Sequence, residues 1–335
     1  MDLAMTSSTN AESPLLIVDN VTKYYDHNLA LREVDISLYS GEIVGFLGVN
    51  GAGKSTLMNI ITGYIAPSMG NILLQGQSIL ENPITSRSLI GYLPENPPLY
   101  HEMTAFEYLS FIAQVRLNKA SKQEQLEAIR SVIDKLNLKT MEHRLIAHLS
   151  KGYRQRVGIA STLLGSPPLL IWDEPTAGLD PQQLQEIHQI LRELRTHHTI
   201  LLSSHMLHEI ESLCDRIIVL HQGEVIQSST PKDLKALCQQ YHPILEIEFD
   251  IPVTTEILSR LKEDLPHDVS IEYPVPQKEN SYIEVQFSPD FTGDSRKILW
   301  QIIKKNQWDL LHFHAREISL EDSFLSLTRV HPKEA

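Results

Sequence analysis

The feature that most constrains the fold is a glycine-rich segment, Gly48 to Ser55, which reads GVNGAGKS and matches the pattern GxxxxGK[ST]. It follows an apolar run, Ile43 to Leu47, and opens a stretch with helical spacing, Thr56 to Tyr64. In this context the glycines let backbone N–H groups turn inward around phosphates, and the helix N-terminus adds its dipole. The segment therefore predicts a strand–loop–helix unit of an α/β fold that holds the phosphates of a nucleotide.

Individual residues of this loop suggest individual roles. We expect Lys54 to reach the β- and γ-phosphates and Ser55 to place its hydroxyl on Mg²⁺. The other nucleotide-binding candidates are its neighbours in the loop and the first turn of the helix: Gly48, Asn50, Gly51, Ala52, Gly53 and Thr56. The alternative is a glycine-rich turn without a ligand, and both the context and the spacing argue against it.

Two adjacent carboxylates, Asp173 and Glu174, follow a second apolar run in the segment LLIWDEP. Strands that alternate with helices predict a mostly parallel sheet, in which ligands bind at the carboxyl ends of the strands. We expect Asp173 to help hold Mg²⁺ and Glu174 to polarise the attacking water as a general base. Two acids at a strand end can also be a solvated loop, but the phosphate loop upstream favours the functional interpretation.

The periodicity along the 335 residues predicts two domains behind a loose polar tail at residues 1–13. Residues 14–240 alternate between strands and helices, with a helical insert at about 97–160. Residues 241–335 follow the order β-α-β-β-α-β, which is the ferredoxin-like arrangement. A short acidic helix stretch, His208 to Glu211, is expected to be a solvated face.

Charge and composition exclude several classes of protein. The net charge of −13, from 29 basic and 42 acidic residues, argues against nucleic acid as a partner. Cys214 and Cys238 lack the spacing of a disulfide framework or a zinc site. No run approaches the roughly 18 to 20 apolar residues that span a bilayer, and the first residues do not resemble a signal peptide. We expect a cytoplasmic protein without direct membrane insertion.

Together these motifs resemble the ABC ATPases over about residues 15–240. Leu149 to Tyr153 reads LSKGY and resembles the family signature LSGGQ: it retains Ser150 and Gly152 but departs at Lys151 and Tyr153. In the family this segment caps the γ-phosphate bound by the opposite subunit, so the resemblance implies a homodimer with two shared ATP sites. A helix capped by Ser150 is compatible with the same residues.

Further motifs of the family occur in the expected order. Asp180 lies where the D-loop has its aspartate, although a turn before a helix that begins at Pro181 fits as well. His205 resembles the switch histidine that contacts the γ-phosphate. Tyr25 resembles the aromatic residue that stacks on adenine, with Tyr24 as the competing candidate.

One position departs from the family in its chemistry. The loop that joins the core to the helical insert normally carries glutamine, and here it carries Glu95. A carboxylate oxygen can ligate Mg²⁺, but an ionised carboxylate cannot donate a hydrogen bond. The resemblance therefore implies Ser55, Asp173 and Glu95 as metal ligands and leaves the positioning of water by Glu95 open.

Three classes of ABC protein compete: the motor subunit of a transporter, a soluble non-transport ATPase of translation or DNA repair, and a regulatory nucleotide-binding module. A single ATPase domain, a short insert and the acidic charge argue against the second class. The third class predicts loss of Lys54, Asp173, Glu174 or His205, and all four are present.

The stretch LPENPPLY, the closing SLEDSFLSLT and the appended domain resemble ATPase subunits of the ABC-2 export type. The alternative for Ser319 to Thr328 is an amphipathic helix that docks on its own domain. The resemblance implies an ATP-hydrolysing homodimer, peripheral on the inner face of the cell membrane, that drives an integral membrane permease with Mg²⁺ and ATP.

Overall fold

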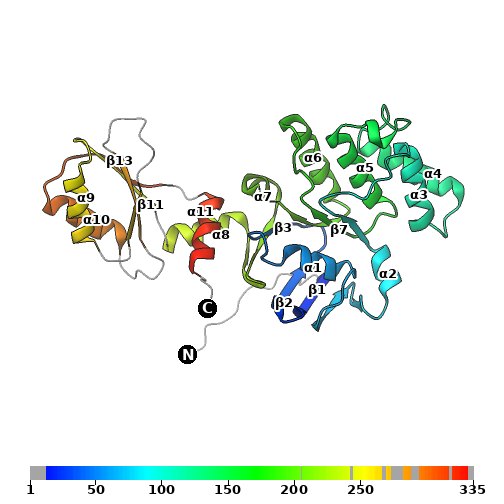
Figure 1. The fold of residues 1–335 in the computed structure, drawn as a ribbon, viewed down its shortest axis with the longest axis horizontal. Coiled ribbons are helices and arrows are strands. Elements are labelled where there is room, and N and C mark those ends of the chain that lie inside the picture. The colour runs from blue at the N-terminus through cyan, green and yellow to red at the C-terminus, as the bar shows by residue number, and fades with distance from the viewer. Residues whose placement is uncertain are drawn as a thin grey trace. The chain divides into compact units, whose positions relative to one another are not determined.

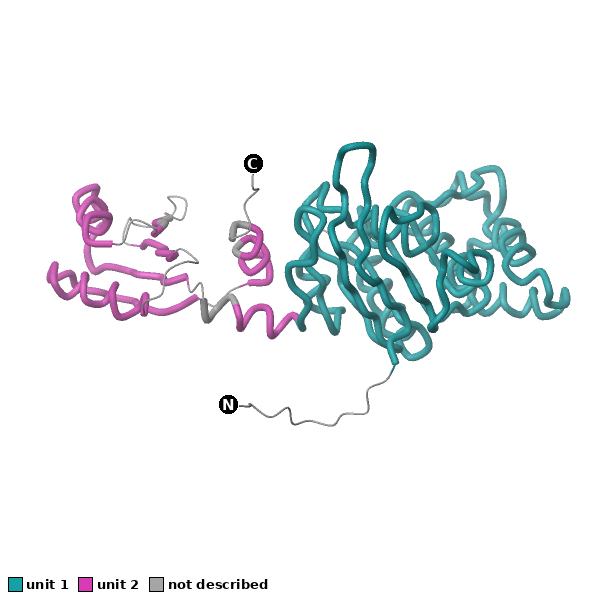
Figure 2. The backbone as a smooth tube through the Cα atoms, turned by 90° about the horizontal axis from the view of Figure 1, so that it is seen from below, with its two compact units in different colours: residues 1–230 teal, residues 231–335 magenta. Residues whose placement is uncertain are grey.

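The computed structural model describes residues 13–204, 206–241, 244–265, 269–272, 282–287, 294–316 and 319–330. Its contacts divide the chain into two compact units, residues 1–230 and residues 231–335 (Figures 1 and 2). The sequence pattern placed this division at residue 240. Helix α8 (Pro231–Tyr241) belongs to the second unit because it packs against α11 (Leu320–Val330). The expected N-terminal tail lies outside the described residues except for its last residue.

A mostly parallel sheet forms the centre of the first unit (Figure 1). Its strands lie in the order β10 (Glu224–Ser229), β9 (Arg216–His221), β3 (Ile43–Leu47), β8 (Thr199–Ser203), β7 (Leu169–Asp173) and β6 (Ile90–Leu93). Neighbours from β9 to β6 run parallel, and β10 pairs antiparallel with β9. All residues of β3 are buried, as its continuous apolar run predicts. The predicted α/β architecture is confirmed.

This topology brings four chain segments to one edge of the sheet. Strands β3, β8, β7 and β6 are successive neighbours and parallel, so their carboxyl ends lie side by side. The chain leaves these ends at Gly48, Ser204, Glu174 and Pro94. The phosphate loop, the paired acids and the segment with Glu95 are therefore neighbours in space although they are distant in sequence.

A second, antiparallel sheet supports the phosphate loop. Its order is β2 (Asn28–Leu38), β1 (Leu16–Tyr25), β4 (Met69–Leu74) and β5 (Gln77–Ser78). Helix α1 (Lys54–Ile61) contributes Leu57, Met58, Ile60 and Ile61 to a core that both sheets share. Burial of four large apolar side chains fixes the helix whose first turn carries Lys54 and Ser55.

The remaining helices of the first unit are α2 (Pro83–Ser88), α3 (Ala105–Arg116), α4 (Lys122–Lys135), the 3₁₀ turn Ile146–His148, α5 (Lys151–Leu163), α6 (Pro181–Leu194) and α7 (Leu207–Leu213). Both α3 and α4 begin with a capping box, in which Thr104 pairs with Glu107 and Ser121 with Glu124. These start signals explain why the helical insert is readable from sequence.

The second unit has the predicted order β-α-β-β-α-β. Between α8 and α11 it contains β11 (Ile244–Phe249), α9 (Thr255–Asp264), β12 (Val269–Glu272), β13 (Tyr282–Phe287), α10 (Ser295–Lys305) and β14 (Leu310–Ala315). Its sheet is antiparallel in the order β12-β13-β11-β14. Alternate residues of β11 face a core that includes Leu261 and Leu299 from the two helices.

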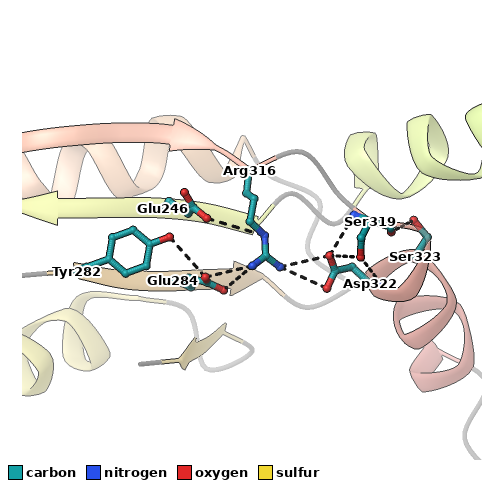
Figure 3. Close-up of polar contacts among 7 residues, drawn as sticks. All are labelled: Glu246, Tyr282, Glu284, Arg316, Ser319, Asp322 and Ser323. Carbon is teal, nitrogen blue, oxygen red and sulfur yellow. Dashed lines mark hydrogen bonds and ion pairs between the residues drawn. The ribbon is translucent and has the colours of Figure 1, made fainter. Parts of the chain in front are cut away.

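An arginine joins this sheet to α11 (Figure 3). The Arg316 guanidinium reaches Glu284 at 3.2 Å and Asp322 at 3.3 Å, and its Nε lies 3.9 Å from Glu246. Asp322 also accepts hydrogen bonds from the backbone N–H and hydroxyl of Ser319 at the start of α11. Ion pairs from two strands and one helix thus converge on one side chain.

In the described ranges, no helix is both long enough and apolar enough to cross a membrane.

Candidate active site

The phosphate-binding loop is tightly packed where its glycines occur. At Gly53 the backbone φ is +106°, and a Cβ would lie 2.7 Å from the Leu31 side chain and 2.8 Å from the carbonyl oxygen of Ala30. At Gly48 a Cβ would lie 2.6 Å from the carbonyl oxygen of Leu220. Only glycine fits at these two positions, because a side chain would collide with backbone atoms of β2 and β9.

Lys54 folds over this loop. Its Nζ donates hydrogen bonds to the carbonyl oxygens of Gly48 at 2.5 Å and Val49 at 3.3 Å. Burial lowers the pKa of the Lys54 ammonium, and the carboxylates of Glu174 and Asp173 oppose that shift. The loop carbonyls thus hold a partly desolvated cation next to two acids, which suits the binding of phosphate oxygens.

A serine that sequence reading missed organises the two acids. The hydroxyl of Ser203 donates to Asp173 Oδ1 at 2.5 Å and accepts from the backbone N–H of Glu174 at 3.0 Å. The other carboxylate oxygen of Asp173 accepts from the Ser55 hydroxyl at 3.3 Å. The pairing of β7 with β8 places Asp173 opposite Ser203, so the signal was the serine at the end of the strand.

The backbone of Glu174 adopts a left-handed conformation, with φ of 51°. This region is uncommon for residues other than glycine, and it persists only where neighbouring contacts enforce it. The Ala177 N–H donates to the Glu174 carbonyl oxygen at 3.2 Å, which closes a tight turn. The candidate base thus lies on a strained turn that begins at the end of β7.

These side chains meet in one cavity of about 250 Å³. It is lined by Ala30, Asn50, Gly51, Gly53, Lys54, Ser55, Thr56, Glu95, Asp173 and Glu174. Most of the residues that the sequence nominated therefore share one site, and Glu95 joins them from the end of β6. Ala30 was missed because an alanine side chain carries no chemical signal. Gly48 and Ala52 belong to the loop but do not line the cavity.

The donor set of this cavity fits Mg²⁺. Two hydroxyl-bearing residues and three carboxylate residues line it, and Mg²⁺ prefers oxygen ligands from one or two carboxylates plus substrate phosphates. The described residues contain no group of three or more His, Cys, Asp or Glu arranged to hold a metal ion on their own. Ser55 and the phosphates of a bound nucleotide are therefore needed to complete the site.

The two aromatic candidates for stacking on adenine lie outside this cavity. Tyr25 ends β1 and is 46% exposed, with Lys23 Nζ 5.2 Å from the centre of its ring. Tyr24 is similarly exposed, and neither tyrosine lines the cavity. His205 lies outside the described residues.

The signature segment begins α5, the D-loop segment begins α6, and these two helix starts are neighbours. The Ser150 hydroxyl accepts from the Tyr153 N–H at 3.4 Å and caps α5, and Asp180 accepts from the Gln183 N–H at 2.9 Å and caps α6. A Cβ at Gly152 would lie 2.3 Å from Gln183 Oε1. The first turns of α5 and α6 are therefore in contact, and neither Ser150 nor Asp180 lines the cavity of its own chain.

Lys151, a departure from the family signature, contacts the D-loop. Its side chain passes over Gly178, where φ is +71° and a Cβ would lie 2.2 Å from Lys151 Nζ. The left-handed φ favours glycine at this position, and the lysine side chain lies directly over it.

Comparison with known proteins decides the family. The model of the family described as "ABC transporter" matches residues 31–177. The uncharacterized ABC transporter ATP-binding protein YxlF of Bacillus subtilis is 33% identical over 313 residues, which cover 93% of this chain and 99% of that protein. The chain belongs to the ABC transporter ATP-binding proteins. As a member of this family it binds ATP and is an ATPase with the P-loop fold.

Two further ABC proteins extend the comparison. The lipopolysaccharide export system ATP-binding protein LptB of Acidithiobacillus ferridurans is 34% identical, over 66% of this chain and 92% of that protein. The dimeric structure of the ATP-binding cassette MJ0796, a post-hydrolysis state bound to ADP and Pi, has a TM-score of 0.60 and 27% identity. This structural match covers 64% of this chain and 98% of the MJ0796 chain. Both matches cover about two thirds of this ABC protein.

Proposed function

We propose that this chain powers an exporter of the ABC-2 type by closing as a homodimer around two molecules of ATP. The observation that carries the proposal is that the phosphate-loop cavity and the signature segment lie apart within one chain. We call these two parts the half-sites. Lys54, Ser55, Asp173 and Glu174 line one cavity, whereas Ser150 caps a helix outside it. A second copy is needed to bring Ser150 and Gly152 to the open side of the nucleotide, as the dimeric relative with ADP and Pi suggests.

Within each half-site the residues divide the work. Lys54 contacts the β- and γ-phosphates, and Ser55 and Asp173 hold Mg²⁺ with Glu95 beside them. The metal ion, when bound, neutralises charge on the phosphate oxygens. Glu174 orients and deprotonates the attacking water, while Ser203 fixes its backbone. Tyr25 stacks on adenine, His205 contacts the γ-phosphate and Asp180 communicates across the dimer.

The permease docks in a second cavity of the first unit. This groove has about 550 Å³ and lies among α1, α3, α5 and the segment after β6; it is lined by Asn59, Tyr64, Tyr92, Leu93, Pro94, Asn96, Pro97, Pro98, Tyr108, Ile112, Val115, Arg116, Ser161 and Thr162. Pro94 and Asn96 line the groove, whereas Glu95 between them lines the nucleotide cavity. A change at the nucleotide therefore reaches the docking groove through one peptide segment.

Export and location rest on likeness to other proteins. A relative that is named for lipopolysaccharide export supports the export direction. The chain then lies on the inner face of the cell membrane, attached through the permease, with no direct insertion. A soluble ATPase of another process is the alternative, and the groove beside the nucleotide cavity, which offers a docking site for a partner, argues against it.

The test is Glu174→Gln in the purified full-length chain. The amide keeps the shape of the side chain but cannot accept a proton, so ATP binding persists and turnover stops. We expect light scattering to give the mass of a dimer for the variant with Mg²⁺ and ATP, and the mass of a monomer without nucleotide. Normal turnover in the variant would remove Glu174 as the base, and a monomer with bound ATP would contradict the closed homodimer.

A further inference from the structure

Glu209 is a buried carboxylate outside the nucleotide cavity. It lies in α7, a stretch that sequence reading assigned to a solvated face, and it is 1% exposed. That expectation is wrong for Glu209, which shares the buried face of α7 with Ile210 and Leu213. Burial of a carboxylate costs free energy unless hydrogen bonds compensate it, so its partners indicate what the residue does.

Two hydroxyl groups donate to one oxygen of this carboxylate. Thr176 Oγ1 lies 2.7 Å and Ser204 Oγ 3.0 Å from Glu209 Oε2, and all three residues are buried. Ser204 Oγ also accepts from the Met206 N–H at 3.0 Å. Glu209 thus links the loop after β7 to the end of β8.

The two linked residues flank the catalytic geometry. Thr176 lies two residues after Glu174 in the sequence, and Ser204 follows Ser203, which holds Asp173 and the Glu174 N–H. The ends of β7 and β8 are therefore tied together twice, by Ser203 on one side of Glu174 and by Glu209 on the other. Such double fixing is what a left-handed residue needs to persist.

The second oxygen of the carboxylate faces a third segment. Glu209 Oε1 lies 3.9 Å from His188 Nε2 in α6, the helix that Asp180 begins. Within the part of the chain that the structure describes, neither atom has a hydrogen-bond partner. The carboxylate therefore lies where the loop after β7, the end of β8 and the D-loop helix meet.

We propose that Glu209 is a positioning residue for ATP hydrolysis, which holds the turn at Glu174 in place through Thr176 and Ser204. The inference rests on the proposed role of Glu174 as the base. Glu209 itself touches neither the cavity nor the nucleotide site. Its effect is on the rate of the chemical step, because a small displacement of a catalytic group costs much of the rate.

The test compares three single variants of the full-length chain, and the double variant of Thr176 and Glu209, by steady-state ATPase kinetics and thermal unfolding. Thr176→Val removes one hydroxyl donor and keeps the shape of the side chain, and Glu209→Gln changes the acceptor. Thr199→Val is the matched control. Thr199 lies at the opposite end of β8, is buried, and bonds to Tyr39 and Gly41 with its hydroxyl.

We expect Thr176→Val and Glu209→Gln to lower kcat about tenfold each, with KM for ATP changed less than about twofold, since Lys54 and Ser55 are untouched. The double variant should lose no more than the larger single loss, because both changes break one interaction. Thr199→Val should lower Tm and leave kcat within about twofold of the wild type.

Two results would overturn the proposal: kcat retained in Thr176→Val and Glu209→Gln, or losses that multiply in the double variant. Glu174→Gln separates this failure from that of the proposed function. Normal turnover in Glu174→Gln contradicts the role of the base, whereas turnover lost there but retained in Thr176→Val contradicts the role of Glu209 alone.

Discussion

The two units of this protein each contain a polar network that binds carboxylates, and the two networks bind them in different ways. In the first unit, Glu209 accepts hydrogen bonds from Thr176 and Ser204, and all three are buried. In the second unit, Arg316 gathers carboxylates from two strands and from α11, and its side chain is 34% exposed (Figure 3).

The reach of the side chains explains the difference. Hydroxyl groups of serine and threonine sit close to the backbone, so a bond from them fixes the backbone of a loop. Arginine has a long stem and a planar fork, so it joins separate elements and tolerates movement of each. The first network therefore suits the positioning of a catalytic turn, and the second suits the docking of a helix.

The largest effect is expected for a change next to the polar network of the first unit. Ser203→Ala removes the donor to Asp173 and the acceptor of the Glu174 N–H. We expect kcat to fall about a hundredfold, because the metal ligand and the base both lose their orientation. Single-turnover ATP hydrolysis measures it. A fall of less than about threefold would show that the strand pairing alone fixes both acids.

Arg316→Ala should affect stability without affecting turnover. Removal of the guanidinium leaves Glu284, Asp322 and Glu246 near one another without their cation. We expect a loss of about 1–2 kcal/mol in the stability of the second unit, less than for a fully buried pair because water screens the site.

Hydrogen exchange of α11 together with ATPase kinetics measures this effect. Arg260→Ala is a suitable control, since its ion pair with Glu256 lies on the surface of one helix. A large loss of kcat in Arg316→Ala would contradict the view that the network of the second unit affects stability and not turnover.

The smallest effect concerns Glu95, which departs from the family glutamine. Glu95→Gln keeps an oxygen that faces the cavity and adds a donor, so we expect kcat to change less than about threefold. The Mg²⁺ dependence of ATPase activity is the informative measurement. Complete loss of turnover would assign a specific role to the carboxylate and make Glu95 part of the positioning network.

Sequence alone predicted the parts that depend on local pattern. Strand β3 follows from an apolar run, helix α1 follows from helical spacing, and most residues around the cavity follow from motifs. The division between the two units was predicted at residue 240 and lies at residue 230, because what assigns α8 to the second unit is its contact with α11, far along the chain.

The same limit applies to the site. Ser203 and Glu209 were missed because their partners come from other segments. A serine at a strand end or an acid on a short helix carries no signal until the sheet order is known. The motifs named most of the groups that line the cavity, and the fold was needed to name the groups that hold them.

The contact between the starts of α5 and α6 has a consequence for cooperativity. The Gln183 amide lies against Gly152 and the Lys151 ammonium lies against Gly178, so the signature and the D-loop of one chain are in direct contact. In the proposed homodimer, a pull on Ser150 by the partner's nucleotide displaces Asp180 as well. The contact then couples the two ATP sites of that homodimer, and the second ATP should bind more tightly than the first.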